Sequence, residues 1–230
     1  SRIYDNPFFV ANKVPNKSEL SRVIGDLNVN YDPTDWLAVR YSFGGDYYTD
    51  WRLEALPLGS GSYASGSVTR ADLINYSLNH NLTATATKTF SDNLAGTFTL
   101  GQNLNSRRYR QTYVLGYDLI APQPYAIQNT TTWEPSEYRS LVHTESYFGQ
   151  GTLDLFQQLY LTAAARNDGF STFGESQRRH WFPKVSGAWV FTNAIGNREQ
   201  RGLLSFGKLR LAYGETGKEP GVYTTIPTTL

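Results

Sequence analysis

The sequence predicts an all-β fold: an antiparallel up-and-down transmembrane β-barrel, of which this chain supplies about eight strands. Apolar and polar residues alternate with period two in several stretches, as they do in strands with one oily and one wet face. Tight turns and long polar stretches follow one another along the chain, and aromatic residues make up 14% of it. Membrane barrels combine short turns at one end, long loops at the other and girdles of aromatic side chains.

The clearest hairpin joins segments 22–31 and 36–43 through a turn at 32–35, where Pro33 presets φ and the Asp side chains can bond their own backbone. One face of the two segments carries Val23, Gly25, Leu27, Val29, Tyr31, Leu37, Val39, Tyr41 and Phe43. The other face carries Arg22, Asp26, Asn28, Asn30, Arg40, Ser42 and Gly44, together with the apolar Ile24. A two-stranded ribbon cannot bury such an oily face by itself. A second sheet or a lipid bilayer must therefore cover it.

Two more hairpins follow, 76–87 with 94–100 and 147–155 with 159–166, and their tight turns are predicted at 91–93 and 156–158. Strand patterns at 184–191 and 208–213 complete the set. His80 is the one polar residue on the apolar side of its segment, and we expect it at or above the bilayer edge. Trp36, Phe90 and Phe156 lie at the tight turns, which suits a periplasmic aromatic girdle.

Long loops are predicted at 47–71, 107–139 and 167–179, with a longer connection at 192–205. Pro122, Pro124 and Pro135 are expected to interrupt any strand ladder in the second of these loops. A soluble sandwich has no physical reason to sort its loop lengths by end. The residues opposite the apolar set, which include Arg, Asn, Thr, Asp and Lys, also suit a wet interior better than a sandwich core.

Composition excludes several classes of function. A formal charge of +1, from 21 basic and 20 acidic residues, gives no footprint for nucleic acid. The absence of cysteine excludes disulfides and thiolate metal sites within these residues. Mean hydropathy is −0.45 and no long apolar run occurs, so a transmembrane helix is not expected. Because the chain begins at Ser1 without a signal peptide, we interpret it as an internal segment of a longer protein.

Candidate ligand-binding residues lie in the predicted loops. Tyr47, Tyr48 and Trp51 could stack on sugar rings or on peptide side chains, and Tyr47 and Tyr48 could equally belong to an outer aromatic girdle. Arg107, Arg108 and Arg110 could clamp carboxylates through paired donors. A solvated loop face, or contact with lipopolysaccharide phosphates, explains these arginines as well.

The sequence does not predict an enzyme, a cofactor or a metal site. The histidines His80, His143 and His180 lack metal-ligand spacing. Asp168 and Gly169 are interpreted as a turn with Arg166 as an ion-pair partner, and Glu134, Glu137 and Glu145 form no recognisable catalytic pair. Gly59, Ser60 and Gly61 lack the strand-to-helix context of a phosphate loop. The charged residues expected to face the interior are Arg40, Arg166, Lys208 and Arg210.

The sequence resembles the SusC/RagA family of TonB-dependent outer-membrane transporters of Bacteroidetes. The stretches that carry the resemblance are 6–9 (NPFF), 22–31 (RVIGDLNVNY) with 35–37 (DWL), 45–50 (GDYYTD), 147–149 (YFG), 160–162 with 166–171 (RNDGFS), 173–174, 182–183, 186, 188–189, and 208–214 (KLRLAYG) with 216–217. They occur in this order over nearly the whole chain. Their joint occurrence is more specific than any one of them.

The resemblance implies that residues 1–230 are a segment of a larger plugged barrel, with the plug and the N-terminal domains outside these residues. It also implies active import of oligosaccharides or peptides, a SusD-like surface lipoprotein as lid, and the TonB-ExbB-ExbD complex as energy source through the N-terminal region. Outer-membrane lipid and lipopolysaccharide would surround the barrel. A passive porin-type barrel and a soluble glycan-binding β-sandwich are the alternative interpretations.

Overall fold

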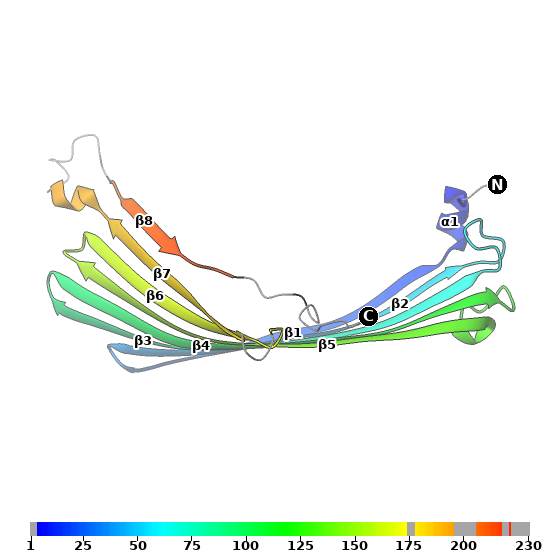
Figure 1. The fold of residues 1–230 in the computed structure, drawn as a ribbon, viewed down its shortest axis with the longest axis horizontal. Helices are drawn as coiled ribbons and strands as arrows, with labels where there is room; N and C mark the ends of the chain where they lie inside the picture. Colours follow the sequence, from blue (N-terminus) through cyan, green and yellow to red (C-terminus); the bar gives the residue numbers. More distant parts are fainter. Residues whose placement is uncertain (1–3, 174–177, 196–205, 218–220, 222–230) are drawn as a thin grey trace. The chain divides into compact units, whose positions relative to one another are not determined.

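The computed structural model describes residues 4–173, 178–195, 206–217 and 221, and within them the chain forms one antiparallel sheet (Figure 1). Eight strands lie side by side in the order in which they occur in the sequence, from β1 to β8. The elements are α1 (Pro7–Lys13), β1 (Asn16–Thr34), β2 (Leu37–Leu56), β3 (Ser67–Ser91), β4 (Leu94–Leu119), the 3-10 helix η1 (Ile127–Asn129), β5 (Thr130–Leu155), β6 (Leu159–Phe170), β7 (Arg179–Trp189), the 3-10 helix η3 (Phe191–Ile195) and β8 (Leu209–Gly214). The predicted up-and-down order is confirmed.

The chain divides into two compact units. We call residues 26–44, 78–106 and 142–230 the turn unit, because the tight turns at 35–36, 92–93 and 156–158 belong to it. Residues 1–25, 45–77 and 107–141 form the loop unit, which contains the longer connections 57–66 and 120–129. Strands β1 to β5 contribute residues to both units, whereas β6, β7 and β8 belong to the turn unit alone.

The two faces of the sheet in the turn unit differ as the alternation predicts. On the polar face, the hydroxyls of Thr85 and Thr99 lie 3.1 Å apart and those of Thr152 and Thr162 lie 3.0 Å apart. On the other face, Leu161 and Leu211 are 43% and 81% exposed. The described strands form no second sheet against this apolar face, so the sandwich alternative receives no support.

The tight turns predicted at 91–93 and 156–158 are confirmed, but the first turn lies at 35–36 and not at 32–35, because β1 continues through Pro33 to Thr34. The predicted long loops are mostly strand. β2 continues to Leu56 and β3 begins at Ser67, so the loop expected at 47–71 shrinks to 57–66. Likewise β4 continues to Leu119 and β5 begins at Thr130, which leaves 120–129 of the loop expected at 107–139. Of the loop expected at 167–179, residues 167–170 belong to β6 and Arg179 begins β7, while residues 174–177 lie outside the described residues. The extensions of β3, β4 and β5 carry polar residues on both faces, so the period-two signal fades there. The extension of β2 keeps its alternation, and the loop expected there is wrong.

Pro135 shows why one predicted ladder-breaker does not break its strand. The backbone of His143 bonds to Ser171 on the β6 side of β5, through its carbonyl and through its N–H. Steps of two residues along β5 bring Pro135 to the same edge, beyond Thr144, where the register with β6 begins. Proline is tolerated in a strand where its missing N–H would face an open edge. Pro122 and Pro124, by contrast, lie in the connection as predicted.

The N-terminal lead forms a short helix that the sequence interpretation missed. Asn6 accepts a hydrogen bond from the N–H of Phe8 at 2.9 Å, and Pro7 occupies the first helical turn. Both are standard helix-start features, because the side-chain oxygen satisfies an orphan N–H and proline has no N–H to lose. At seven residues the helix α1 is too short to give a periodic signal. No helix among the described residues is long and apolar enough to cross a membrane.

A small apolar cluster orders the connections of the loop unit. Ala55, Val68 and Leu119 are buried together, with Leu53, Tyr125 and Ile127 packed against them. The side chain of Asn129 ties the connection 120–129 to itself by donating to the carbonyls of Ala121 at 2.7 Å and Pro124 at 2.9 Å. The longer connections are therefore held in place by packing and hydrogen bonds.

Candidate functional site

Charged side chains on β1 and β2 pair across the polar face of the loop unit. Arg22 of β1 donates from Nε and Nη2 to the two carboxylate oxygens of Asp46 on β2, at 2.9 and 2.7 Å. This forked geometry fixes both side chains, since two parallel bonds leave little freedom. Four residues further along β2, Asp50 accepts from Ser18 Oγ and from Arg52 Nε, each at 2.7 Å. Asp50 is only 5% exposed, so this carboxylate is compensated inside the sheet.

Tyrosine rings lie on the same face beside these pairs. The guanidinium of Arg22 is 5.9 Å from the ring centre of Tyr48. Across the sheet, the rings of Tyr109 on β4 and Tyr138 on β5 are 6.0 Å apart, and Tyr109 donates to Gln111 at 2.9 Å. We call the set of Arg22, Asp46, Tyr48, Asp50, Arg52, Tyr109 and Tyr138 the tyrosine–carboxylate face. Flat rings with polar tips next to mutually neutralised charges suit contact with sugar rings or extended peptides.

The three aromatic residues predicted to bind ligand lie in strand β2 and not in a loop, so that part of the prediction is wrong. The strand places them on two different faces of the sheet. Tyr48 belongs to the tyrosine–carboxylate face, whereas Tyr47 packs edge-on against Tyr76 with ring centres 6.4 Å apart. Trp51 shares the side of Tyr47 and lies 5.2 Å beneath the guanidinium of Arg70. Neighbouring residues in a strand point to opposite faces. Only Tyr48 of the three is therefore placed beside the paired charges.

The three predicted arginines are divided in the same way. Arg107, Arg108 and Arg110 are all exposed and lie within β4, where a loop was predicted. Arg107 is two residues from Tyr109 and shares its face, while Arg108 and Arg110 point to the opposite face. Their role in ligand contact stays a prediction.

The sequence interpretation missed most of the tyrosine–carboxylate face. Asp46, Tyr48 and Asp50 occur at i, i+2 and i+4, which is a strand signal for one polar face. This spacing fits the strand that the structure shows, and the loop expected at 47–71 is wrong for this segment. The partners on β1, β4 and β5 are far away in sequence, and only the pairing of the strands brings them together.

Two of the charged residues predicted to face the interior already have partners within the sheet of the turn unit. Arg40 pairs with Asp32 at 2.5 Å. Arg166 donates to Asp168 at 2.6 Å and to Ser146 Oγ at 2.9 Å. Lys208 lies 5.4 Å from the ring centre of Tyr160, and Arg210 is opposite Ala188 in the register of β7 and β8.

His80 and Asp168 take structural positions. His80 Nδ1 is 2.8 Å from the hydroxyl of Tyr41 and its ring centre is 4.8 Å from that of Phe43, which explains a histidine on the apolar face. Asp168 and Gly169 lie inside β6, so the turn predicted there is wrong, although the predicted ion pair with Arg166 is present. Within the part of the chain that the structure describes, no three His, Asp or Glu residues are placed to hold a metal ion.

A meander sheet with one apolar and one polar face defines the wall of an up-and-down β-barrel. Comparison with known families gives the particular assignment. A sequence model described as "TonB dependent receptor-like, beta-barrel" matches residues 3–229, so the chain belongs to that family. The family is one of receptor barrels and not of enzymes.

Solved structures support the same fold. The chain resembles the structure of the RagAB peptide transporter with a TM-score of 0.85 at 18% identity, covering 94% of this chain and 25% of that one. It also resembles the RagAB peptide importer in its "closed-closed" state with a TM-score of 0.83 at 19% identity, covering 94% of this chain and 24% of that one. The chain thus spans about a quarter of the length of these structures. A search of curated protein sequences finds no significant match.

Proposed function

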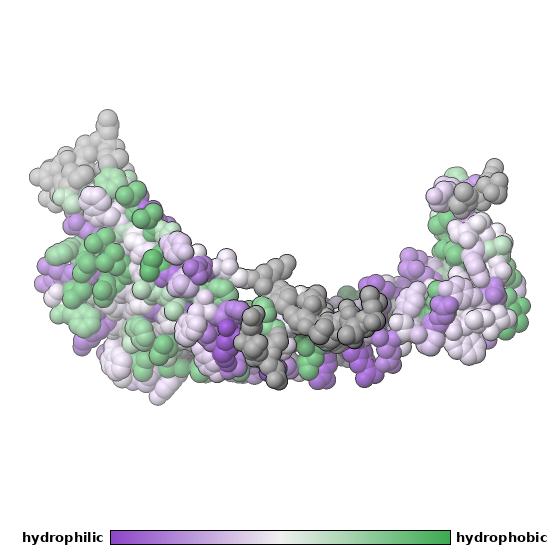
Figure 2. Space-filling model, in the orientation of Figure 1, coloured by the Kyte–Doolittle hydropathy of each residue, from purple (hydrophilic) through white to green (hydrophobic). Residues whose placement is uncertain are grey.

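We propose that this chain forms part of the barrel wall of a SusC-like, TonB-dependent active importer that carries oligosaccharides or peptides across the bacterial outer membrane. The observation that carries the proposal is the division of one sheet into an exposed apolar face and a paired polar face. Val185, Leu161 and Leu211 stand exposed on the apolar face of the turn unit, and hydrophobic side chains gather over β6 to β8 in Figure 2. A bilayer would cover this face, while the polar face would line the interior.

The interior of such a barrel would hold a plug domain outside these residues. A SusD-like surface lipoprotein would close the outer mouth, and the TonB-ExbB-ExbD complex would supply energy through the N-terminal region. Because the similar structures are of a peptide transporter, peptides are the first substrates to test, with oligosaccharides second.

The tyrosine–carboxylate face is the proposed substrate-contacting surface of this segment. Tyr48 would offer a ring to a sugar or a peptide side chain, and Arg107 would offer charge-assisted hydrogen bonds. Tyr47, Trp51, Arg108 and Arg110 lie on the other side of their strands, away from the interior that we propose.

The test compares neighbouring residues in full-length transporter. Tyr48→Ala should weaken substrate affinity by about two- to tenfold, because an aromatic contact contributes roughly 0.5–1.5 kcal/mol beyond its buried area. Tyr47→Ala is the matched control and should leave uptake unchanged. Arg107→Ala and Arg108→Ala form a second pair of the same design. The measurement is the uptake of labelled peptides as a function of their concentration. If both variants of each pair change the substrate affinity equally, the assignment of the faces is wrong.

Energy dependence separates this function from a passive porin. Uptake through the proposed importer should stop when a protonophore collapses the inner-membrane gradient or when TonB is deleted. Unchanged uptake under both conditions would favour a porin-type barrel.

A further inference from the structure

Side chains on the apolar face of β5 to β8 fall into rows, because the strand register aligns them. From the tight turns outward, the rows are Leu155, Leu159, Trp189 and Leu209; Leu153, Leu161, Gly187 and Leu211; Gly151, Ala163, Val185 and Tyr213; Gly149, Ala165 and Pro183; Tyr147, Asn167 and Trp181; and Glu145, Gly169 and Arg179. The first four rows are apolar except for the Tyr213 hydroxyl. The fifth is aromatic and amide, and the sixth contains a carboxylate and a guanidinium.

The height of the apolar rows matches a bilayer. Trp189 and Trp181 are eight residues apart on β7, which is about 27 Å along a strand. At the tilt of about 40° usual for membrane barrels this becomes about 21 Å, close to the apolar band of about 25 Å that such barrels present between their aromatic girdles. The charged row therefore falls at the level of the lipid headgroups, at the end of the band away from the tight turns.

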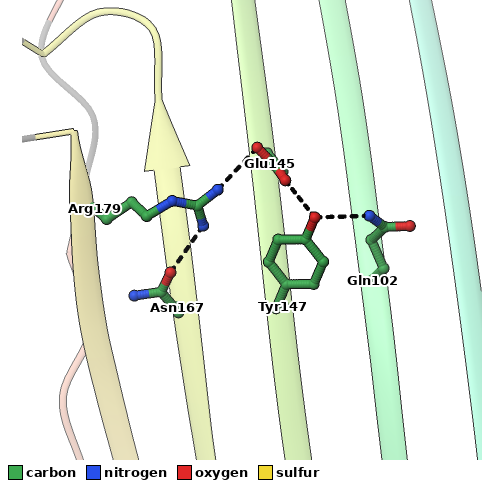
Figure 3. Close-up of polar contacts among 5 residues, drawn as sticks. All are labelled: Gln102, Glu145, Tyr147, Asn167 and Arg179. Atoms are coloured by element: carbon green, nitrogen blue, oxygen red, sulfur yellow. Dashed lines mark hydrogen bonds and ion pairs between the residues drawn. The ribbon is translucent and has the colours of Figure 1, made fainter. Parts of the chain in front are cut away.

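A polar network joins the last two rows to β4 (Figure 3). Arg179 donates to Glu145 Oε2 at 2.9 Å and to Asn167 Oδ1 at 2.8 Å. The hydroxyl of Tyr147 donates to the other oxygen of Glu145 and accepts from Gln102 Nε2 at 3.0 Å. Three of the five N–H groups of Arg179 make no hydrogen bond within the described residues, and its side chain is 43% exposed. The network thus holds an ion pair without net charge, and the guanidinium of this pair keeps donors to spare.

An apolar hollow of about 550 Å³ begins at this network and runs toward the middle of the band. Gly149 and Ala165 form part of its lining, Leu82, Leu100 and Trp181 line it as larger residues, and Gln102 and Tyr147 also contribute. A Cβ on Gly149 would lie 3.3 Å from Leu100 Cδ2, so the missing side chain at 149 helps to open the space. The hollow would accept a chain of methylene groups and has few polar partners for water.

We propose that this hollow and network bind one lipid A moiety of lipopolysaccharide, with an acyl chain in the hollow and a phosphate at Arg179. The inference rests on the proposed function, which puts the end of the band away from the tight turns in the outer leaflet. A guanidinium with unused donors matches a phosphate. The amide of Gln102 and the hydroxyl of Tyr147, which are both partly exposed, match the hydroxyl groups of a phosphorylated sugar better than a simple glycerophosphate.

The test measures lipid retained by full-length transporter in phosphatidylcholine nanodiscs that contain lipid A, by native mass spectrometry. Arg179→Gln should lower lipid A retention about tenfold, because the charge-assisted bonds are lost, and Arg179→Lys should give an intermediate loss. Ala165→Leu fills the hollow without touching the network and should lower retention on its own. Lys184→Gln, on the opposite face of the same strand, is the control and should bind as wild type.

The outcomes separate this inference from the proposed function. Equal retention by wild type, Arg179→Gln and Ala165→Leu would overturn the lipid A site, as would displacement of lipid A by phosphatidylglycerol at equal concentration. A second copy of the transporter at this face, detected as a dimer that excludes lipid, would overturn it too. If wild type imports substrate but retains no lipid A, only the lipid site is wrong. Absence of TonB-dependent uptake would instead refute the proposed function.

Discussion

Tyr47 and Tyr48 are adjacent in the sequence and contact different partners, Tyr76 and Arg22. Their side chains take opposite faces because a strand alternates, so the sequence could have separated them once the segment was recognised as strand. Because both residues are tyrosines in a segment expected to be a loop, both are equal candidates for ligand contact from the sequence. The partners could not be predicted, because Arg22 and Tyr76 reach them through strand pairing over more than twenty residues of sequence.

A substitution at Gly66 tests whether the connections of the loop unit are ordered by close packing. Its φ is +71°, and a Cβ there would lie 2.5 Å from Leu119 Cδ1 and 2.8 Å from the carbonyl oxygen of Leu56. Gly66→Ala should therefore lower the local stability by about 1–3 kcal/mol. Amide hydrogen exchange of residues 117–130 should speed up accordingly. Gly25→Ala, with nothing within 4 Å of its Cβ, should exchange as wild type.

The contact between Asp5 and the connection 57–66 should depend on pH. Hydrogen bonds from the Ser60 hydroxyl and the Gly61 N–H hold the pKa of this carboxyl below its usual value, since they favour the charged form. The contact therefore stabilises the protein at neutral pH and is lost as the pH falls below about 4, through the folded-state pKa. NMR should show the Gly61 amide losing exchange protection, corrected for intrinsic rates, over that range. Asp5→Asn should remove the pH dependence, and a pH-independent amide in wild type would refute the assignment.

The strands are longer than the sequence predicts. β3, β4 and β5 contain 25, 26 and 26 residues, whereas β6 and β7 contain 12 and 11. A tilted strand needs about 9–11 residues to cross a bilayer. In the proposed membrane setting, β6 and β7 match this requirement and β3 to β5 extend well beyond it. The tight turns at 92–93 and 156–158 could be predicted because apolar alternation flanks them, while the extensions of β3, β4 and β5 lack that contrast.

Charge placement on β6 tests which face meets lipid. Ala163→Lys should destabilise the full-length protein in lipid vesicles by about 2–4 kcal/mol, because the ammonium would lie in the middle row of the apolar band, between those of Trp189 and Trp181. Thr162→Lys, one residue along and on the polar face, should cost less than about 1 kcal/mol. Urea unfolding monitored by tryptophan fluorescence measures both. A larger loss for Thr162→Lys would reverse the assignment of the faces.

At the scale of the whole molecule, the described residues bury few large apolar side chains and leave many exposed. Buried hydrophobic residues are Ala55, Val68, Ala71, Leu119, Val142 and Val190, and four of these six belong to the loop unit. In the turn unit, the apolar rows of β5 to β8 have no protein layer over them among the described residues. An oily sheet face of this kind needs lipid, detergent or further protein to cover it.

The isolated 230-residue chain should therefore aggregate in buffer without detergent. The edge strands β1 and β8 should increase this aggregation, because each presents unpaired backbone groups along one side. Full-length transporter in detergent should remain monodisperse. Light scattering distinguishes the two, and a soluble, monomeric and cooperatively folded isolated chain would support the sandwich that the sheet order argues against.

The most direct test of the membrane-wall assignment uses single cysteines, which the chain lacks. Spin labels placed one at a time at residues 159–164 of full-length transporter in lipid vesicles report collisions with oxygen, which dissolves in the bilayer, and with a water-soluble nickel chelate. Labels at Leu159, Leu161 and Ala163 should collide mainly with oxygen, and labels at Tyr160, Thr162 and Ala164 should be shielded from lipid. Equal nickel accessibility at all six positions, with no period of two, would contradict a lipid-facing sheet.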